Sequence, residues 1–342
     1  MAYGSWRHAA LAVLLAACAA LAPPLAHAAD PCPLLRAQQA APDTATRIAA
    51  TACDEHQAWY RGFIDREGRL VGSAVREAEA SRLANGQSAW LRVAGYWRDS
   101  GLLWQVQQRA GAADCAAARD AYPSPGCRGF VVDTPWSAAF VSWVMRRAAL
   151  PGFGASASHV DYVRAAYRDP DGSPYRIVDP HAARPARGDL LCYVRVPGRN
   201  YGFSGLATLL STQDSGLGMH CDIVVSAGEA ADRTARLVGG NVFDGVTMRL
   251  LPLTDGGRFE DLPSRGDDGV ECSPDQSSAC SANRQDWAAL LQLRPQGELA
   301  RLAPAPPMAG PGPAATTPQC CVHCVLGAGV PRCPATGPVP VD

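Results

Sequence analysis

The sequence contains no lysine and no excess of either charge. All 31 basic residues among the 342 are arginine, and 32 acidic residues bring the formal net charge to −1. The two signs are interspersed, so there is no basic stripe of the kind that nucleic-acid binding needs, and we expect no nucleic-acid partner. The lack of lysine indicates a compositional bias rather than a mechanism. A hydrophobic content of 47% is typical of a globular protein with a sizeable core.

Recognisable metal-binding patterns are also missing. There is no HExxH, and no paired-cysteine spacing of the zinc-site type supports a metal site at His159, His220 and Asp222. A metal site formed by His159, His220 and Asp222 is therefore a distant alternative, and we expect neither a metal nor another cofactor. The segment "CCVHC" at 320–324 could bind zinc, but local disulfides in an exported, proline-rich tail explain it better.

The N-terminus has the features of an export signal. Arg7 and His8 precede the apolar run "AALAVLLAACAALA", which is too short and alanine-rich to span a membrane. The sequence "AHA" at 26–28 predicts cleavage of a signal peptide, residues 1–28, and a mature chain that starts near Ala29. The alternative is a lipobox, "LAAC", which would give membrane anchoring through a lipidated Cys18. Both interpretations predict export to the bacterial envelope, in the periplasm or attached to the outer membrane.

The cysteine content agrees with export. The chain has 13 cysteines, and 12 are left without Cys18, an even number that indicates disulfides in an oxidising compartment. Near neighbours are the simplest pairs, and strand residues can pair if their strands are adjacent. The predicted pairs are Cys32 with Cys53, Cys115 with Cys127, Cys272 with Cys280, and Cys192 with Cys221.

Helical patterns dominate the first half of the sequence. Asp43 or Thr44 can cap a first helix that runs through "TRIAATACDEHQAWYRGFI" to residue 64. A second is predicted over about 70–84, and a third has apolar residues at helical spacing over 90–97. Residues 110–132 are predicted to form a loop. A fourth helix starts in "DTPWSAAFVSW", with Thr134 as its N-cap and Pro135 at its first position, which places Ser137 in the first turn.

The second half is rich in short apolar strands. They are predicted over 189–196, 220–227, 235–240 and 246–253, with turn residues between them. Sequential strands tend to be neighbours, so we expect an α+β fold in which an antiparallel meander packs on the N-terminal helices. The predicted divisions are a helical extension at 29–61, a main domain at 62–294, and a Pro/Ala/Gly-rich, disordered tail at 295–342.

Chemistry at Ser137 requires a base and a group that orients the base. His220 opens a predicted strand after the glycine-rich stretch "SGLGM", and Asp222 points to the same sheet face because it is two residues further on. Asn241, in the turn after the next strand, is a second candidate orienter. Each residue also has an ordinary structural interpretation: a first-turn serine, a strand-start histidine, a solvated charge and a turn asparagine.

Several segments together resemble a bacterial family catalogued as domain of unknown function 2272. The resemblance spans about 62–294. The matching pieces are "RGFIDREGRL", "ANGQSAWLRVAGYW", "DTPWSAAFVSWVM", "SASHVDY", "GDLLCYVR", "HCDIVV" and "VGGNVFDGVTMR".

A wider resemblance links the same segments to the CHAP and NlpC-type cell-wall hydrolases. It implies a papain-like α+β core, with Ser137 as nucleophile, His220 as base and Asn241 or Asp222 as orienter. Trp136 and His159 are expected to line the cleft; for His159, capping of the local turn is an equal alternative. The chain departs from those families by having serine where they have cysteine.

Two functions are therefore expected. The first is hydrolysis of an amide or ester bond in the envelope, with peptidoglycan peptides as the expected substrate. The alternative is a catalytically inactive protein that binds peptidoglycan or another envelope component through the same cleft. The replacement of cysteine by serine at position 137 matters for both functions, because a helix end can favour a thiolate but cannot ionise a hydroxyl. A hydrolase would need a histidine as a true general base, and a binding protein would not.

Overall fold

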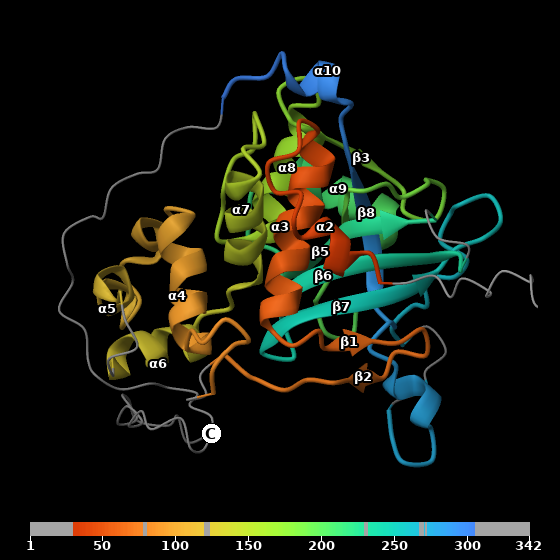
Figure 1. Cartoon of the computed structure of the whole chain (residues 1–342). Coiled ribbons are helices and arrows are strands. Elements are labelled where there is room, and N and C mark those ends of the chain that lie inside the picture. The colour runs from red at the N-terminus through yellow and green to blue at the C-terminus, as the bar shows by residue number, and fades with distance from the viewer. Residues whose placement is uncertain are drawn as a thin grey trace, which may run out of the picture.

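The fold is built on an eight-stranded sheet (Figure 1). The computed structural model describes residues 30–77, 81–119, 124–228, 232–266, 270 and 272–304. Neighbouring strands are antiparallel except for β1 and β7, and the order is β2-β1-β7-β6-β5-β4-β8-β3. The strands are β1 (Phe63–Ile64), β2 (Leu70–Val71), β3 (Tyr175–Val178), β4 (Leu190–Val194), β5 (Met219–Ala227), β6 (Thr234–Val242), β7 (Gly245–Pro252) and β8 (Asp286–Leu293).

Helices cover one face of this sheet and extend beyond it. Figure 1 shows α3 and α7 against the sheet, with α4, α5 and α6 grouped at the left of the view, on the far side of α7. The helices are α2 (Cys32–Leu35), α3 (Thr44–Ala58), α4 (Ala89–Asp99), α5 (Ala112–Ala117), α6 (Pro125–Asp133), α7 (Ser137–Arg147), α8 (His159–Arg168), α9 (Gly202–Thr212) and α10 (Gln296–Leu299). Two short 3₁₀ helices are η1 (Leu103–Val106) and η2 (Ser277–Cys280).

The sheet carries a separate apolar cluster on each face. The larger cluster joins α3, α4, α6, α7 and α8 to one face, and includes Ile48, Phe140 and Ile223. The smaller one lies on the other face, where Phe259 packs over strand residues such as Val224. Strand residues that are buried on both sides account for the nearly continuous apolar runs in the sequence.

The sequence predicts the start of α3 and the central strands correctly, but the predicted helix continues to Ile64, whereas α3 ends at Ala58 and Phe63–Ile64 forms β1. The side chain of Asp43 accepts hydrogen bonds from the N–H groups of Ala45 at 3.2 Å and Thr46 at 2.9 Å, as an N-cap should. β5, β6 and β7 form the predicted antiparallel meander, and β4 lies beside β5. The chain is thus a mixed α+β protein with a mostly antiparallel sheet.

Two predictions in the first half are wrong. Residues 70–77 form β2 and an extended segment instead of a helix, because Leu70 and Val71 pair with β1 and Gly72 then turns the chain at φ 73°. The predicted loop at 110–132 contains α5 and α6. At Gly111 a Cβ would lie 2.0 Å from the carbonyl oxygen of Gly126, so the small residues in this stretch permit two helices to pack closely.

The start of α7 also differs from the prediction. Thr134 is the C-cap of α6, and Trp136 takes the N-cap position of α7, so the helix begins at Ser137. The predicted N-cap of Thr134 and first position of Pro135 are therefore two residues too early. Ser137 nevertheless lies in the first turn, where backbone N–H groups have no acceptor within the helix.

All four predicted disulfides are present: Cys32–Cys53, Cys115–Cys127, Cys192–Cys221 and Cys272–Cys280. Cys192 and Cys221 face each other directly in the register of β4 and β5. The second bond ties α5 to α6. These bonds are consistent with an exported protein.

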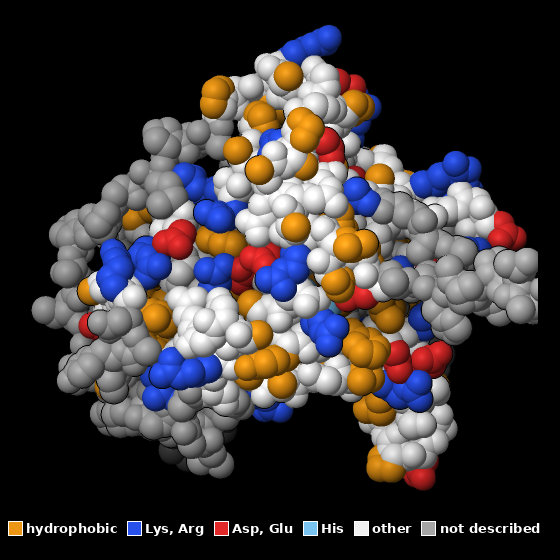
Figure 2. Space-filling view, viewed as in Figure 1, with side chains coloured by type: hydrophobic (Ala, Val, Ile, Leu, Met, Phe, Trp, Pro, Cys, Tyr) orange, Lys and Arg blue, Asp and Glu red, His pale blue; other side chains and the backbone are white. Residues whose placement is uncertain are grey.

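The ends of the chain fall largely outside the described residues, including the predicted signal peptide at 1–28, Cys18, and the tail from 305 onward. Gln296–Leu299, at the start of the predicted tail, forms α10, and Leu299 is buried. Within the described ranges, no helix has the length and apolar character that crossing a membrane requires. On the face seen in Figure 2, arginine and acidic side chains are interspersed and apolar side chains form small separate groups.

Candidate functional site

Ser137 is held at the beginning of α7 by the packing of its neighbour. The Trp136 side chain is fully buried and stacks between Trp59 and Tyr96, with ring centroids at 5.8 and 5.5 Å. This anchor fixes the position at which the helix starts. Ser137 itself is 6% exposed, so its hydroxyl lies in a largely dry environment.

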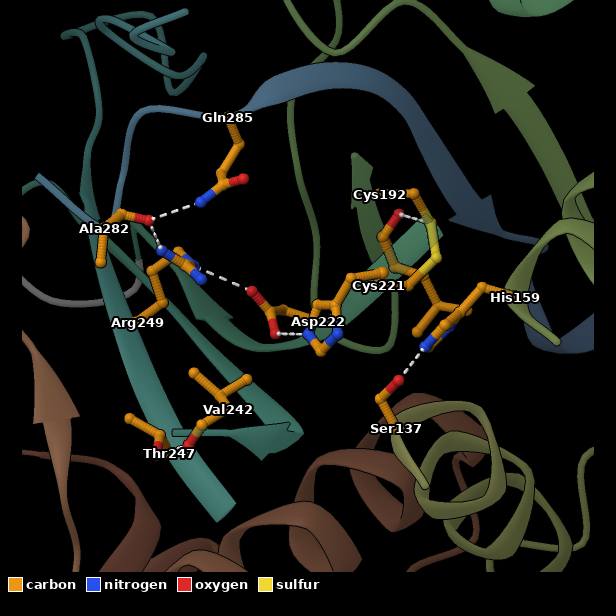
Figure 3. Close-up of polar contacts among 12 residues, drawn as sticks. Ser137, His159, Cys192, Cys221, Asp222, Val242, Thr247, Arg249, Ala282 and Gln285 are labelled. Carbon is orange, nitrogen blue, oxygen red and sulfur yellow. Dashed lines mark hydrogen bonds and ion pairs between the residues drawn. A yellow bond between two sulfur atoms is a disulfide. The ribbon is translucent and has the colours of Figure 1, made fainter. Parts of the chain in front are cut away.

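The hydroxyl of Ser137 contacts an imidazole from the next helix. Its Oγ lies 2.7 Å from Nε2 of His159, the first residue of α8 (Figure 3). The other ring nitrogen, Nδ1, is hydrogen-bonded to the hydroxyl of Tyr162, one helical turn further along α8. Ser156 fixes the start of α8, since its Oγ donates to Asp161 at 2.6 Å.

A second polar chain starts at His220 on β5. Nε2 of His220 lies 2.8 Å from Oδ1 of Asp222, and Nε of Arg249 donates to Oδ2 of the same carboxylate at 2.9 Å. Arg249 in turn donates to the carbonyl oxygen of Ala282 at 2.7 Å (Figure 3) and to Oδ1 of Asn283 at 2.9 Å. The carboxylate therefore has a partner at each oxygen.

The three side chains of this second polar chain are buried and strongly coupled electrostatically. His220, Asp222 and Arg249 are each at most 2% exposed. Burial alone raises the pKa of Asp222, but attraction and hydrogen bonds from His220 and Arg249 outweigh it and hold that pKa well below its usual range. Asp222 is thus a carboxylate, which can only accept hydrogen bonds.

A glycine makes room for this carboxylate. At Gly239 on β6, a Cβ would lie 2.0 Å from Oδ1 of Asp222. At the next residue, Gly240, it would lie 2.4 Å from the ring of Phe140 on α7, on the opposite face of the sheet. The "GGN" segment, which the sequence predicts as a turn, instead lies on β6. It is part of the site's construction, because each glycine admits a side chain from another element.

The two polar chains meet at their imidazoles. The ring centroids of His159 and His220 are 5.2 Å apart, and the ring of Tyr193 on β4 lies 5.1 Å from the His220 ring. Burial, with repulsion from His220, lowers the pKa of His159 well below its ordinary value, so this imidazole is neutral. Burial likewise raises the pKa of Tyr162 well above its ordinary value and keeps its hydroxyl protonated.

Asn241 belongs to a different group. With its amide nitrogen toward Glu77, Asn241 donates to Oε2 of Glu77 at 3.3 Å and accepts from the backbone N–H of Trp136 at 3.1 Å, the orientation that satisfies both amide atoms. The Trp136 indole N–H also donates to Glu77. Burial raises the pKa of Glu77 to about 8. Asn241 and Glu77 thus hold the residue before Ser137, and it is Asp222 that accepts the hydrogen bond from His220.

The structure brings Ser137, His159, His220 and Asp222 together and places Trp136 beside them. Sequence reasoning expected Ser137 to contact His220, whereas its hydrogen bond goes to His159. It also missed Tyr162, Arg249 and Glu77. The i, i+3 spacing in "HVDY" and an arginine inside the apolar strand "VTMRLLPL" were available signals, because a charge buried in a strand requires a partner.

Neither a thiol nor a metal cluster accompanies these residues in the described part of the chain. All eight cysteines there are paired, so Cys192 and Cys221 cannot serve as nucleophiles. The described residues contain no group of three or more histidine, cysteine, aspartate or glutamate side chains able to hold a metal ion.

Comparison with known proteins identifies the family. Residues 84–293 match the model of a family described as uncharacterized protein conserved in bacteria (DUF2272), and the chain belongs to this family. No match was found among curated proteins or among solved structures. The function therefore has to be argued from the site itself.

Proposed function

We propose that the protein is an exported serine-type hydrolase with a papain-like core, which cleaves an amide or ester bond in the bacterial envelope. Peptidoglycan peptides are the proposed substrate. The observation that carries the proposal is the placement of Ser137, a buried hydroxyl in the first turn of α7 with an imidazole nitrogen at 2.7 Å. A second imidazole, oriented by a carboxylate, lies directly beside the first.

His220 is the proposed general base, and its tautomer supports this role. Both oxygens of the Asp222 carboxylate accept hydrogen bonds, so Nε2 of His220 must carry the proton that it shares with Oδ1. In neutral His220 the unprotonated nitrogen is then Nδ1. Asp222 would fix this tautomer and stabilise the imidazolium that forms during the reaction, as a carboxylate does in a serine–histidine–aspartate triad.

The proposed reaction follows the order of acyl transfer. Oγ of Ser137 attacks the carbonyl carbon while its proton passes to Nδ1 of His220, and free N–H groups in the first turn of α7 face the resulting oxyanion. Collapse breaks the bond to the leaving amine or alcohol, which takes the proton from His220. Water then attacks the acyl-serine with His220 again accepting a proton, and the ester bond to Ser137 breaks as Oγ takes that proton from His220.

The rival function is binding without turnover. The burial of the site residues favours this alternative, since Ser137, His159 and His220 are 6%, 4% and 1% exposed. A buried polar network of this kind can also serve to fix the fold of a binding protein. Turnover measurements separate the two.

The test compares turnover of Ser137→Ala and His220→Ala with that of the native protein on peptidoglycan fragments and activated esters. Each variant should lose at least about a thousandfold in kcat/KM, because triad members act as a unit. Ser211→Ala is the matched control, since it removes an exposed serine hydroxyl on α9 whose hydrogen bond goes to the carbonyl oxygen of Thr208. His181→Ala, at an exposed position, is the second control.

Two results would refute the hydrolase. One is turnover that survives in folded Ser137→Ala. The other is native protein that binds peptidoglycan fragments but shows no turnover on either substrate class, which would establish the binding protein instead.

A further inference from the structure

Tyr162 has no evident role in the reaction proposed above, yet its hydroxyl is buried in the site. Tyr162 is 4% exposed, and within the described residues the hydroxyl's hydrogen bond is to Nδ1 of His159. Its ring packs on Phe153, with centroids 5.4 Å apart. Tyr162, His159 and Ser137 thus form a continuous buried chain of hydrogen bonds across α8 and α7.

Hydrogen-bond accounting determines the direction of this chain. The Tyr162 hydroxyl is protonated, and leaving its O–H unpaired in a buried site would carry the full desolvation cost of that donor. Its partner, Nδ1 of His159, must then be the acceptor. Neutral imidazole carries one proton, which accordingly lies on Nε2, and Nε2–H donates to Oγ of Ser137.

We infer that Tyr162 is a positioning residue that fixes the tautomer of His159, so that His159 donates a hydrogen bond to Ser137 and cannot act as its base. The inference deepens the proposed function and, in its catalytic meaning, rests on it. The two imidazoles then have separate tasks. His159 holds Oγ and stabilises negative charge that develops there, and the serine proton is left for Nδ1 of His220.

The direct test is the tautomer of His159, which NMR reads from the ¹⁵N shifts of histidine ring nitrogens in labelled protein at neutral pH. The resonance is assigned by its loss in His159→Asn. We expect protonated Nε2 and unprotonated Nδ1 in the native protein. Ser137→Ala should keep this tautomer, because Tyr162 sets it. Tyr162→Phe should shift the population toward protonated Nδ1.

Tyr175→Phe is the matched control. Tyr175 is also buried and also packs on Phe153, but its hydroxyl donates to the carbonyl oxygen of Gly188 at 3.1 Å. This variant should leave the His159 shifts unchanged. A native His159 with its proton on Nδ1, or shifts that Tyr162→Phe does not alter, would overturn the inference and would make His159 the acceptor for the serine proton.

Kinetics give a second readout. Tyr162→Phe should lower kcat about tenfold with KM within about twofold, because it alters the reacting geometry rather than substrate binding, whereas Tyr175→Phe should change both by less than about twofold. Equal losses in the two variants would indicate a merely structural role and overturn the inference. Native protein without turnover would refute the hydrolase, while the NMR result would still decide the tautomer.

Discussion

At the scale of single residues, the site depends on residues that take no part in a reaction themselves. Gly239 lets the Asp222 carboxylate lie against β6, where it can receive hydrogen bonds from both His220 and Arg249. A substitution that displaces this carboxylate would remove the orientation of His220 without changing any residue that reacts.

Gly239→Ala tests this dependence. The new Cβ would lie 2.0 Å from Oδ1 of Asp222 and 2.9 Å from Val242, so we expect a stability loss of about 1–3 kcal/mol from overpacking and a fall in kcat. Chemical unfolding and turnover measure the two effects. Gly216→Ala, with open space around the added carbon, is the control. Unchanged turnover in Gly239→Ala would show that the position of Asp222 is not needed.

Glu77 makes the stability of the fold depend on pH. Its pKa rises from 4.5 to about 8 in the fold, since burial, with repulsion from Asp244, disfavours the carboxylate. The raised value means that the folded state binds more protons, so the stability that protonated Glu77 contributes is full below about pH 4.5. It is lost as the pH rises through about 8.

Glu77→Gln should remove most of that loss. Between pH 5 and pH 8.5 the unfolding free energy of the native protein should fall on the order of 3 kcal/mol more than that of the variant. Urea titrations at the two pH values measure the difference. Asp189, whose pKa is raised to about 7, is common to both proteins and cancels. A control, Asp255→Asn, changes an exposed carboxylate. Parallel pH curves for native protein and Glu77→Gln would contradict the assignment.

Residue patterns predicted part of this site. Ser137, His220 and Asp222 were found because each stands at a recognisable position: the first turn of a helix, the start of a strand, and the same face two residues later. The contact of Ser137 with His159 could not be predicted, because it depends on how α8 packs against α7. The same holds for Arg249 and Glu77, whose partners lie far away in the sequence.

At the scale of elements, the beginning of α7 is the main feature of the proposed site. Its positive end lies beside two imidazoles, an environment that favours negative charge. The hydroxyl of serine stays protonated there, but a thiol at the same position would ionise more easily than free cysteine.

Ser137→Cys allows the effect of this environment to be measured as the pH dependence of thiol alkylation. We expect iodoacetamide to alkylate residue 137 with a midpoint below about pH 7.5, compared with about 8.5 for an ordinary thiol. Peptide mapping by mass spectrometry separates this thiol from other cysteines, and the same variant in denaturant supplies the control. A folded-state midpoint near that of free cysteine would mean that the site is not poised for nucleophilic chemistry.

The elements differ in how well the sequence predicts them. α3, α4 and β4 to β7 have strong periodicity or capping signals and were predicted. The segment at 70–77 was not, since its few apolar residues acquire strand geometry only by pairing with β1. α5 and α6 were missed because they are short and rich in glycine and alanine, and because a disulfide and the packing of residues such as Phe130 on Trp97 stabilise them.

At the scale of the whole molecule, disulfides and the two-sided sheet define the framework. One bond, Cys192–Cys221, crosses the central strands between the site's His220 and Asp222, which flank Cys221 in sequence. The pairing could be predicted because cysteine spacing and strand adjacency constrain it. The position of β8 between β4 and β3 could not, since that order depends on a long connection.

Thiol counting checks this framework. In native protein unfolded under non-reducing conditions, the eight cysteines between Cys32 and Cys280 should give no reaction with a thiol reagent. They should react after reduction. Peptide mapping restricts the count to those residues, and stoichiometric free thiol at Cys192 or Cys221 would contradict the framework.

The central claim, that Ser137 is a nucleophile, is tested most directly by reaction with a fluorophosphonate, which phosphonylates activated serines. The account predicts one adduct in the intact mass of the native protein, mapped to Ser137, and none in Ser137→Ala or in protein unfolded before treatment. His220→Ala should react at least about a hundredfold more slowly, since the base is missing. Native, folded protein that gains no adduct at Ser137 would contradict the claim.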